Sequence, residues 1–124
     1  MLGSSTLQVI ICAVRMPEAE RFYSEVLELR LIGHSLGALI YDVGGTALRV
    51  SPVPALQPSA HTVLGFAVPE LEPVAAALHS KGVKPERFPG FVHDERGIVR
   101  APDGSRVLWM RDPEGNLLSV VQFA

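Results

Sequence analysis

The sequence predicts an α+β protein that consists of two tandem β-α-β-β-β modules. The main observation is a hairpin pattern over residues 107–121, where two apolar segments flank the turn sequence Asp-Pro-Glu-Gly-Asn. In this turn Pro113 presets φ, and Gly115 can adopt a positive φ. A degenerate copy of the hairpin occupies residues 42–50, so the chain is predicted to contain an internal duplication.

The first module is predicted to begin with a strand over Leu7–Val14, whose apolar run, broken only by Gln8, suits burial on both faces. Pro17 can open the helix that follows. Apolar residues at helical spacing give this helix a buried face of Ala19, Phe22, Tyr23 and Val26. Three further strands are expected over residues 29–32, 39–43 and 47–53.

We expect a single domain over residues 1–124, with module one at 6–53, a proline-rich linker at 54–60 and module two at 61–124. The second module repeats the order of the first.

Module two is predicted to open with a strand over 61–68. Its helix is opened by Pro73 and capped by Gly82. The apolar face of this helix is expected to comprise Val74, Ala77 and Leu78. An edge strand over 83–88 is expected, and the segment 89–103, which departs most from the repeat, is either a binding lid or a plain surface loop.

Composition excludes several classes of function. Of the 124 residues, 48% are hydrophobic and 19% are charged, as is typical of a globular protein. The net charge of −2 provides no electrostatic basis for binding nucleic acid. Cys12 is the only cysteine, which excludes an intrachain disulfide and a cysteine-based zinc site. No signal peptide or membrane span is visible, so we expect a cytoplasmic protein that does not bind a membrane.

Two segments resemble signature sequences of the vicinal oxygen chelate superfamily, which contains glyoxalase I, bleomycin-resistance proteins and extradiol dioxygenases. Residues 19–29 are similar to the family pattern A-x-x-F-Y-x-x-x-L-G-L, and residues 111–116 to x-D-P-D-G-N. Residues 97–122 also resemble small bacterial members. The resemblance covers nearly the whole chain and implies sheets that curl around a shared cavity, and a homodimer. It implies no activity, because members share architecture without sharing chemistry.

The resemblance also implies where a metal ion would be held. Metal-dependent members place ligands on the first and last strands of each module. These positions fall here on Gln8 (or Val9 in a shifted register), Arg49, Val63 and Ser119. Only Gln8 offers a suitable donor, since Arg49 is a fixed cation, Val63 is inert and a lone hydroxyl is a poor anchor. We therefore expect no metal cofactor, with a divalent metal ion in an atypical site as the alternative.

The histidines could contribute to such an atypical site. His61 shares strand parity with Val63 and could face the rim of the cavity. His93 lies beside two carboxylates in the long loop, and this trio could fold over the cavity or remain a group of solvated charges. His79 is expected in a structural role in the last turn of a helix, and His34 has no identifiable partner.

Alternation along the strands predicts which side chains face the cavity. These candidates are Tyr41, Arg49, Trp109, Arg111 and Ser119. Trp109 is either a ligand platform or a core residue, and Arg111 either contacts a ligand or holds the adjacent turn. Arg49 interrupts an apolar strand, where burial without a partner is costly, so it faces solvent or binds an anion in the cavity.

These observations, together with the resemblance, predict a metal-independent protein that binds a small, planar or anionic molecule in the cavity between its two modules. Its ligand-binding residues are expected to be Gln8, Tyr41, Arg49, His61, Trp109, Arg111 and Ser119. Two alternatives stay open. One is a metal-dependent lyase, isomerase or dioxygenase that uses Gln8, His61 and a residue of 93–95, and the other is a metal-free enzyme in which Arg49 stabilises an oxyanion.

Overall fold

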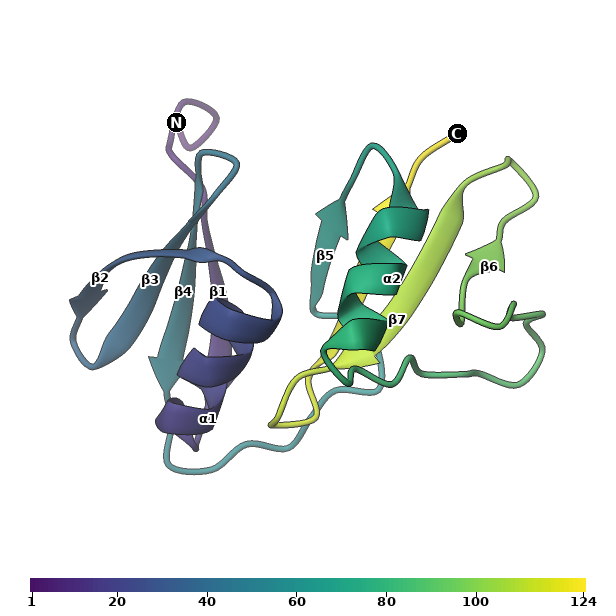
Figure 1. Cartoon of the computed structure of the whole chain (residues 1–124). Coiled ribbons are helices and arrows are strands. Elements are labelled where there is room, and N and C mark those ends of the chain that lie inside the picture. Colours follow the sequence, from purple (N-terminus) through teal and green to yellow (C-terminus); the bar gives the residue numbers. More distant parts are fainter. The chain divides into compact units, whose positions relative to one another are not determined.

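The computed structural model describes all 124 residues, which form two compact units, Met1–Gln57 and Pro58–Ala124. The division falls within the predicted linker of residues 54–60. Each unit contains a four-stranded sheet and a helical segment in the order β-α-β-β-β (Figure 1), which confirms the predicted α+β fold of two tandem modules. None of the helices has the length and apolar character that a membrane crossing requires.

Unit 1 runs through β1 (Gln8–Ala13), α1 (Met16–Arg21), the π-helical segment η1 (Phe22–Val26), β2 (Arg30–Ser35), β3 (Ala38–Val43) and β4 (Thr46–Pro52). Its strands lie in the order β1-β4-β3-β2, with β1 parallel to β4 and the other pairs antiparallel. Pro17 stands at the start of α1 as predicted, where its missing N–H breaks no helical hydrogen bond.

The helical segment of unit 1 buries one face of its sheet. The predicted helical face is buried at Ala19, Phe22 and Tyr23. The prediction that β1 is buried on both faces is wrong, because Ile11 is 4% exposed whereas Ile10 is 56% exposed. Successive side chains of a strand point to opposite faces, and α1 and η1 cover only one of them.

Unit 2 runs through β5 (Leu64–Ala67), α2 (Leu71–Ser80), β6 (Val99–Arg100), β7 (Arg106–Arg111) and β8 (Leu117–Gln122). The strand order β5-β8-β7-β6 repeats that of unit 1, and β5 is parallel to β8. This equivalence supports the internal duplication that the two hairpin patterns predict. β5 is shorter than the strand predicted over 61–68.

The buried face of α2 differs from the predicted one. Its buried residues are Leu71, Ala75 and Leu78. The helix begins at Leu71, before Pro73, so its buried stripe starts at Leu71 and continues at helical spacing. Ala77 lies outside this stripe and points to solvent. The predicted cap at Gly82 is confirmed, since its φ is +83° and the N–H of Val83 donates to the carbonyl of Leu78.

The turn between β7 and β8 forms as predicted, with a φ of +92° at Gly115. Oδ1 of Asp112 accepts hydrogen bonds from the backbone N–H groups of Glu114 and Asn116, both at 2.9 Å. Its Oδ2 accepts from Nδ2 of Asn116 at 2.8 Å. Both Asp112 and Asn116 are buried, so their polar groups satisfy one another away from water.

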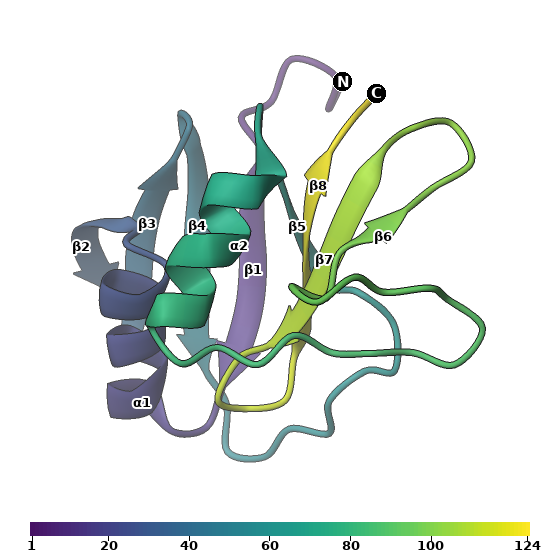
Figure 2. The same ribbon diagram turned by 45° about the vertical axis from the view of Figure 1, so that its right-hand side comes forward.

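The connection between α2 and β6 contains little regular structure and loops out beyond β7 before it returns (Figure 2). The predicted edge strand over 83–88 is absent apart from one bridge between Glu86 and Trp109. Pro85 and Pro89 flank this bridge, and neither can donate to a strand ladder.

The turn between β6 and β7 is held by Asp103. Its Oδ1 accepts from the N–H of Ser105 at 2.9 Å, and its Oδ2 accepts from the hydroxyl of Ser105 at 3.1 Å. These hydrogen bonds favour the ionised carboxylate and lower the pKa of Asp103 below its ordinary value.

Candidate functional site

Arg49 lies on the face of the unit 1 sheet opposite α1 and η1, which we call the helix-free face. Its cross-strand neighbours are Ile10 of β1 and Ile40 of β3. Its Nη2 donates to the carbonyl oxygen of Ser35 at 2.7 Å, and the guanidinium forms no other hydrogen bond within the protein. Gln8 shares this face of the sheet and is exposed at the start of β1. The remaining N–H groups of Arg49 are therefore free to bind an anion.

Tyr41 lies on the opposite face, and its predicted place beside Arg49 is wrong. It pairs with Leu48 across the strands and is fully buried, with its hydroxyl 2.8 Å from Oγ of Ser24 and its ring 6.2 Å from that of Tyr23. Burial raises the pKa of Tyr41, the hydrogen bond to Ser24 opposes this rise, and the charge of Glu20 adds to it. Tyr41 is thus a core residue of unit 1.

In unit 2 the helix-free face carries Trp109 and Ser119, which are direct cross-strand partners. Ser119 is also paired with Gly65 of β5, where an added Cβ would lie 3.0 Å from Oγ of Ser119. Glycine therefore leaves room beside this hydroxyl. Neither the indole N–H of Trp109 nor the hydroxyl of Ser119 forms a hydrogen bond within the protein, so both can bind an external group.

Three rings from the connection between α2 and β6 surround Trp109. The centroids of Phe88, Phe91 and His93 lie 5.4 Å, 5.5 Å and 6.3 Å from that of Trp109. Phe88 meets it edge to face, a preferred arrangement of aromatic pairs. Phe91 is nevertheless 54% exposed. We call these four residues the aromatic cluster. Phe88 packs against Trp109, whereas Phe91 exposes much of its ring to solvent.

His93 holds the backbone of this connection in place. Its Nε2 accepts from the N–H of Phe88 at 3.0 Å, and its Nδ1 lies 2.9 Å from the carbonyl oxygen of Gly97. These partners assign a neutral ring with the proton on Nδ1. Oδ1 of Asp94 accepts from the N–H groups of Arg96 and Ile98, both at 2.9 Å. His93 is thus tied to the backbone of the connection. Asp94 and Glu95 are exposed to solvent, in agreement with one of the two expectations for this trio.

The side chain of Arg111 forms its two hydrogen bonds with residues of unit 2. Its Nε donates to Oε1 of Glu86 at 3.1 Å, and its Nη1 donates to the carbonyl oxygen of Gly115 at 2.7 Å. The second bond closes the turn between β7 and β8. These contacts support the interpretation in which Arg111 holds the turn.

No group of three or more His, Cys, Asp or Glu side chains in the chain could hold a metal ion. His61 lies outside the strand predicted for it, because β5 begins only at Leu64, and its ring bonds to Ser59 in an exposed loop. Val63 also precedes β5, and His34 and His79 are exposed. The residues at the matched positions therefore do not fit the metal centre of the metal-dependent families.

Sequence reasoning missed the partners of Trp109 and Arg111, namely Phe88, Phe91 and Glu86. All three lie between α2 and β6, where the structure forms no helix or strand. The local density of rings in residues 88–93 is the only sequence signal for the aromatic cluster.

Comparison with known proteins points to one superfamily. The model of the Glyoxalase/Bleomycin resistance protein/Dioxygenase superfamily matches residues 6–120. No curated protein sequence matches the chain.

Solved structures of similar fold include three from bacteria. A protein of Bacillus anthracis assigned to the glyoxalase family is 16% identical, with a TM-score of 0.78 and coverage of 98% of this chain and 96% of that one. Lactoylglutathione lyase from Agrobacterium tumefaciens is 18% identical, with a TM-score of 0.73 and coverage of 96% and 93%. A fosfomycin resistance protein from Listeria monocytogenes is 12% identical, with a TM-score of 0.74 and coverage of 98% and 94%. At these identities the similarity concerns the fold alone.

Proposed function

The chain belongs to the Glyoxalase/Bleomycin resistance protein/Dioxygenase superfamily, and we propose that it is a small-molecule binding protein that works without a catalytic metal ion. The ligand is planar and partly apolar, carries a carbonyl or anionic oxygen, and contacts the helix-free face of unit 2. One observation carries this proposal. The indole N–H of Trp109 and the hydroxyl of Ser119 are neighbours on that face and have no partner in the protein.

The two donors suit one acceptor oxygen of a ligand. Polar groups that are withdrawn from water normally find a hydrogen-bond partner, and both residues are half-buried. The exposed ring of Phe91 lies beside Trp109 and adds an apolar surface against which a planar molecule can stack. A small number of placed polar groups in an aromatic surround is the usual composition of a small-molecule site.

Arg49 is the candidate anion contact of unit 1. Its guanidinium has one hydrogen bond to a backbone carbonyl and no carboxylate partner, so its charge is not neutralised by the protein. A carboxylate could bind in the bidentate manner that guanidinium groups favour. Gln8, on the same face, is a further candidate contact.

Thermal-shift screening with planar carboxylates and phenols tests the proposal, because a ligand that binds the folded state raises the melting temperature. Compounds that bind should quench the fluorescence of Trp109, which is the only tryptophan. By calorimetry, Trp109→Phe should weaken binding about tenfold through loss of the indole donor and ring area. Ser119→Ala should weaken it by about threefold to tenfold, the usual effect of one hydrogen bond.

Phe123→Leu is the matched control, since Phe123 is a 69% exposed aromatic residue outside the sheet. Binding that is unchanged in both Trp109→Phe and Ser119→Ala would refute the assignment of the site. For Arg49→Ala, the matched control is Arg21→Ala, which removes an exposed arginine of α1. Only Arg49→Ala should weaken the binding of anionic compounds.

Elemental analysis of the dialysed protein tests the metal-free part of the proposal. A stoichiometric content of nickel, zinc, iron or manganese would favour the enzyme alternative instead. The homodimer implied by the family resemblance and the cytoplasmic location also belong to this proposal. Light scattering coupled to size-exclusion chromatography tests the dimer.

A further inference from the structure

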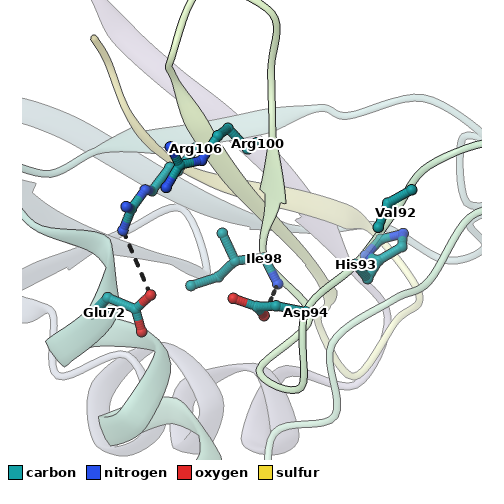
Figure 3. Close-up of a pocket in the computed structure, with 7 residues that line it drawn as sticks. All are labelled: Glu72, Val92, His93, Asp94, Ile98, Arg100 and Arg106. Carbon is teal, nitrogen blue, oxygen red and sulfur yellow. Dashed lines mark hydrogen bonds and ion pairs between the residues drawn. The ribbon is translucent and has the colours of Figure 1, made fainter.

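A hollow lies in unit 2, on the α2 side of the sheet rather than on its helix-free face. Its volume is about 280 Å³. We call it the β6 pocket, and its lining residues are Glu72, Val92, His93, Asp94, Ile98, Arg100 and Arg106 (Figure 3). Arg106 has the strand parity of Leu108 and Met110, which are buried on the α2 side, so this pocket is separate from the face that carries Ser119.

Two arginines of the β6 pocket face each other across the strands. Arg100 of β6 and Arg106 of β7 are direct antiparallel partners. Like charges in this position repel. Arg106 has one ion pair, with Oε1 of Glu72 at 3.6 Å from its Nη1, whereas the side chain of Arg100 has no hydrogen bond or ion pair in the protein. An anion bound by both guanidinium groups would relieve the repulsion and supply the missing partner.

The remaining walls of the pocket are apolar and acidic. Ile98 is 5% exposed and separates the arginines from Asp94, as Figure 3 shows, and Val92 is an exposed apolar residue at the rim. Oδ1 of Asp94 is occupied by two backbone N–H groups, and Oδ2 has no hydrogen bond. Oδ2 is therefore available to accept a hydrogen bond from an ammonium or amide group.

We propose that the β6 pocket binds a small zwitterion of the amino-acid type. Its carboxylate lies between Arg100 and Arg106, its short apolar body lies against Ile98, and its ammonium group donates to Asp94. A pocket of about 280 Å³ lies just below the usual range for drug-sized ligands, about 300–1,000 Å³, which suits a small metabolite of this kind.

The aromatic cluster provides a reporter for this pocket. His93 lines the β6 pocket, and the centroid of its ring lies 6.3 Å from that of Trp109. A ligand that occupies the pocket should therefore change the fluorescence of Trp109. This signal reports binding directly and needs no assay of activity. The proposal does not depend on binding at Ser119, because Ser119→Ala leaves every group of the β6 pocket in place.

The test titrates the ¹⁵N-labelled protein with ω-amino acids from glycine to 6-aminohexanoate at constant ionic strength. Each is compared with the carboxylate and the amine of equal chain length, and with inorganic phosphate. At least one amino acid should bind at least about fivefold more tightly than either of its singly charged analogues, a gain expected from a second charged hydrogen bond. The amide shifts should centre on Ile98 and Arg100.

Arg100→Ala and Asp94→Asn should each weaken this binding at least about fivefold, since each removes one of its charged contacts. Asn retains the Oδ1 acceptor that holds the loop, and Arg100 makes no contact whose loss would unfold the unit. Arg21→Ala, which lowers the net charge equally in unit 1, should bind as the original protein does. Equal affinity for amino acids and their singly charged analogues, or equal binding by all variants, would overturn the proposal. Preferential binding of phosphate would replace the zwitterion by a simple anion and also overturn it.

Discussion

Removal of the Asp112 side chain should destabilise the protein far more than the same change in the duplicated hairpin. In Asp112→Ala at least three hydrogen bonds are lost, and two of them involve donors of Asn116, which is 5% exposed. In Asp42→Ala one turn hydrogen bond is lost, from the N–H of Gly45 at 3.1 Å, together with a 3.9 Å ion pair to Arg30. The second site is exposed, so water can replace these partners.

The magnitudes follow from this difference in burial. A buried donor left without a partner costs about 1–3 kcal/mol, so two such donors in Asp112→Ala should lower the free energy of unfolding by about 2–6 kcal/mol. Asp42→Ala should lower it by about 0.5–1 kcal/mol, because exposed hydrogen bonds and ion pairs contribute little.

Urea unfolding followed by the fluorescence of Trp109 and by circular dichroism measures both values. Trp109 lies in unit 2, so its fluorescence reports on the unit that contains Asp112. Equal losses in the two variants would refute the reasoning, since they would mean that the buried network of Asp112 and Asn116 adds nothing over an exposed turn. A loss below about 1 kcal/mol for Asp112→Ala would refute it as well.

Three further predictions concern titration and backbone strain. Because the pKa of Asp103 is lowered in the folded state, its carboxylate stabilises the fold above the ordinary pKa near 4, and this contribution is lost as the pH falls through the folded value. Asp103→Asn should therefore lower the melting temperature at pH 7 but not at about pH 2. The raised pKa of Tyr41 means that the unfolded state loses this proton first, so stability should fall above about pH 10. In Tyr41→Phe that alkaline fall should be shallower, while stability at pH 7 drops by about 1 kcal/mol with the lost hydrogen bond. Gly97→Ala places a Cβ 2.6 Å from the ring of Pro85 at a φ of +91°, whereas Gly90→Ala has a similar φ and open space. In urea unfolding we expect losses of more than about 2 kcal/mol for the first and about 1 kcal/mol for the second.

Strand alternation predicted the faces of some residues and failed for others. In β4 the apolar neighbours Leu48 and Val50 are buried on the side of the helical segment. Because successive side chains of a strand point to opposite faces, Arg49 lies on the other face. Placing Tyr41 on the same face required the pairing between β3 and β4, which depends on the length of the turn. The turn pairs Val43 with Thr46, so Tyr41 meets Leu48, and Arg49 meets Ile40. A one-residue difference in such a pairing exchanges the two faces.

The connection between α2 and β6 could not be derived from periodicity. It is held by hydrogen bonds between side chains and backbone. The ring of His93 accepts from the N–H of Phe88 and bonds to the carbonyl oxygen of Gly97, and Oδ1 of Asp94 accepts from the N–H of Ile98. Such bonds depend on three-dimensional geometry and leave no repeating pattern in the sequence. The hairpins were predictable because their turn residues act locally and occur twice.

The edge strand of unit 2, β6, is short, and this explains why the aromatic cluster and the β6 pocket both lie in that unit. In unit 1 the edge strand β2 pairs with β3 from Arg30 to Ser35 and so occupies the hydrogen-bonding edge of β3. In unit 2 β6 pairs only with the first residues of β7, so the rest of the β7 edge is open. Glu86 bridges to Trp109 at this open edge, and the rings that follow it pack around the indole. A full-length edge strand would exclude these rings, so loss of regular pairing at β6 is what permits the aromatic cluster.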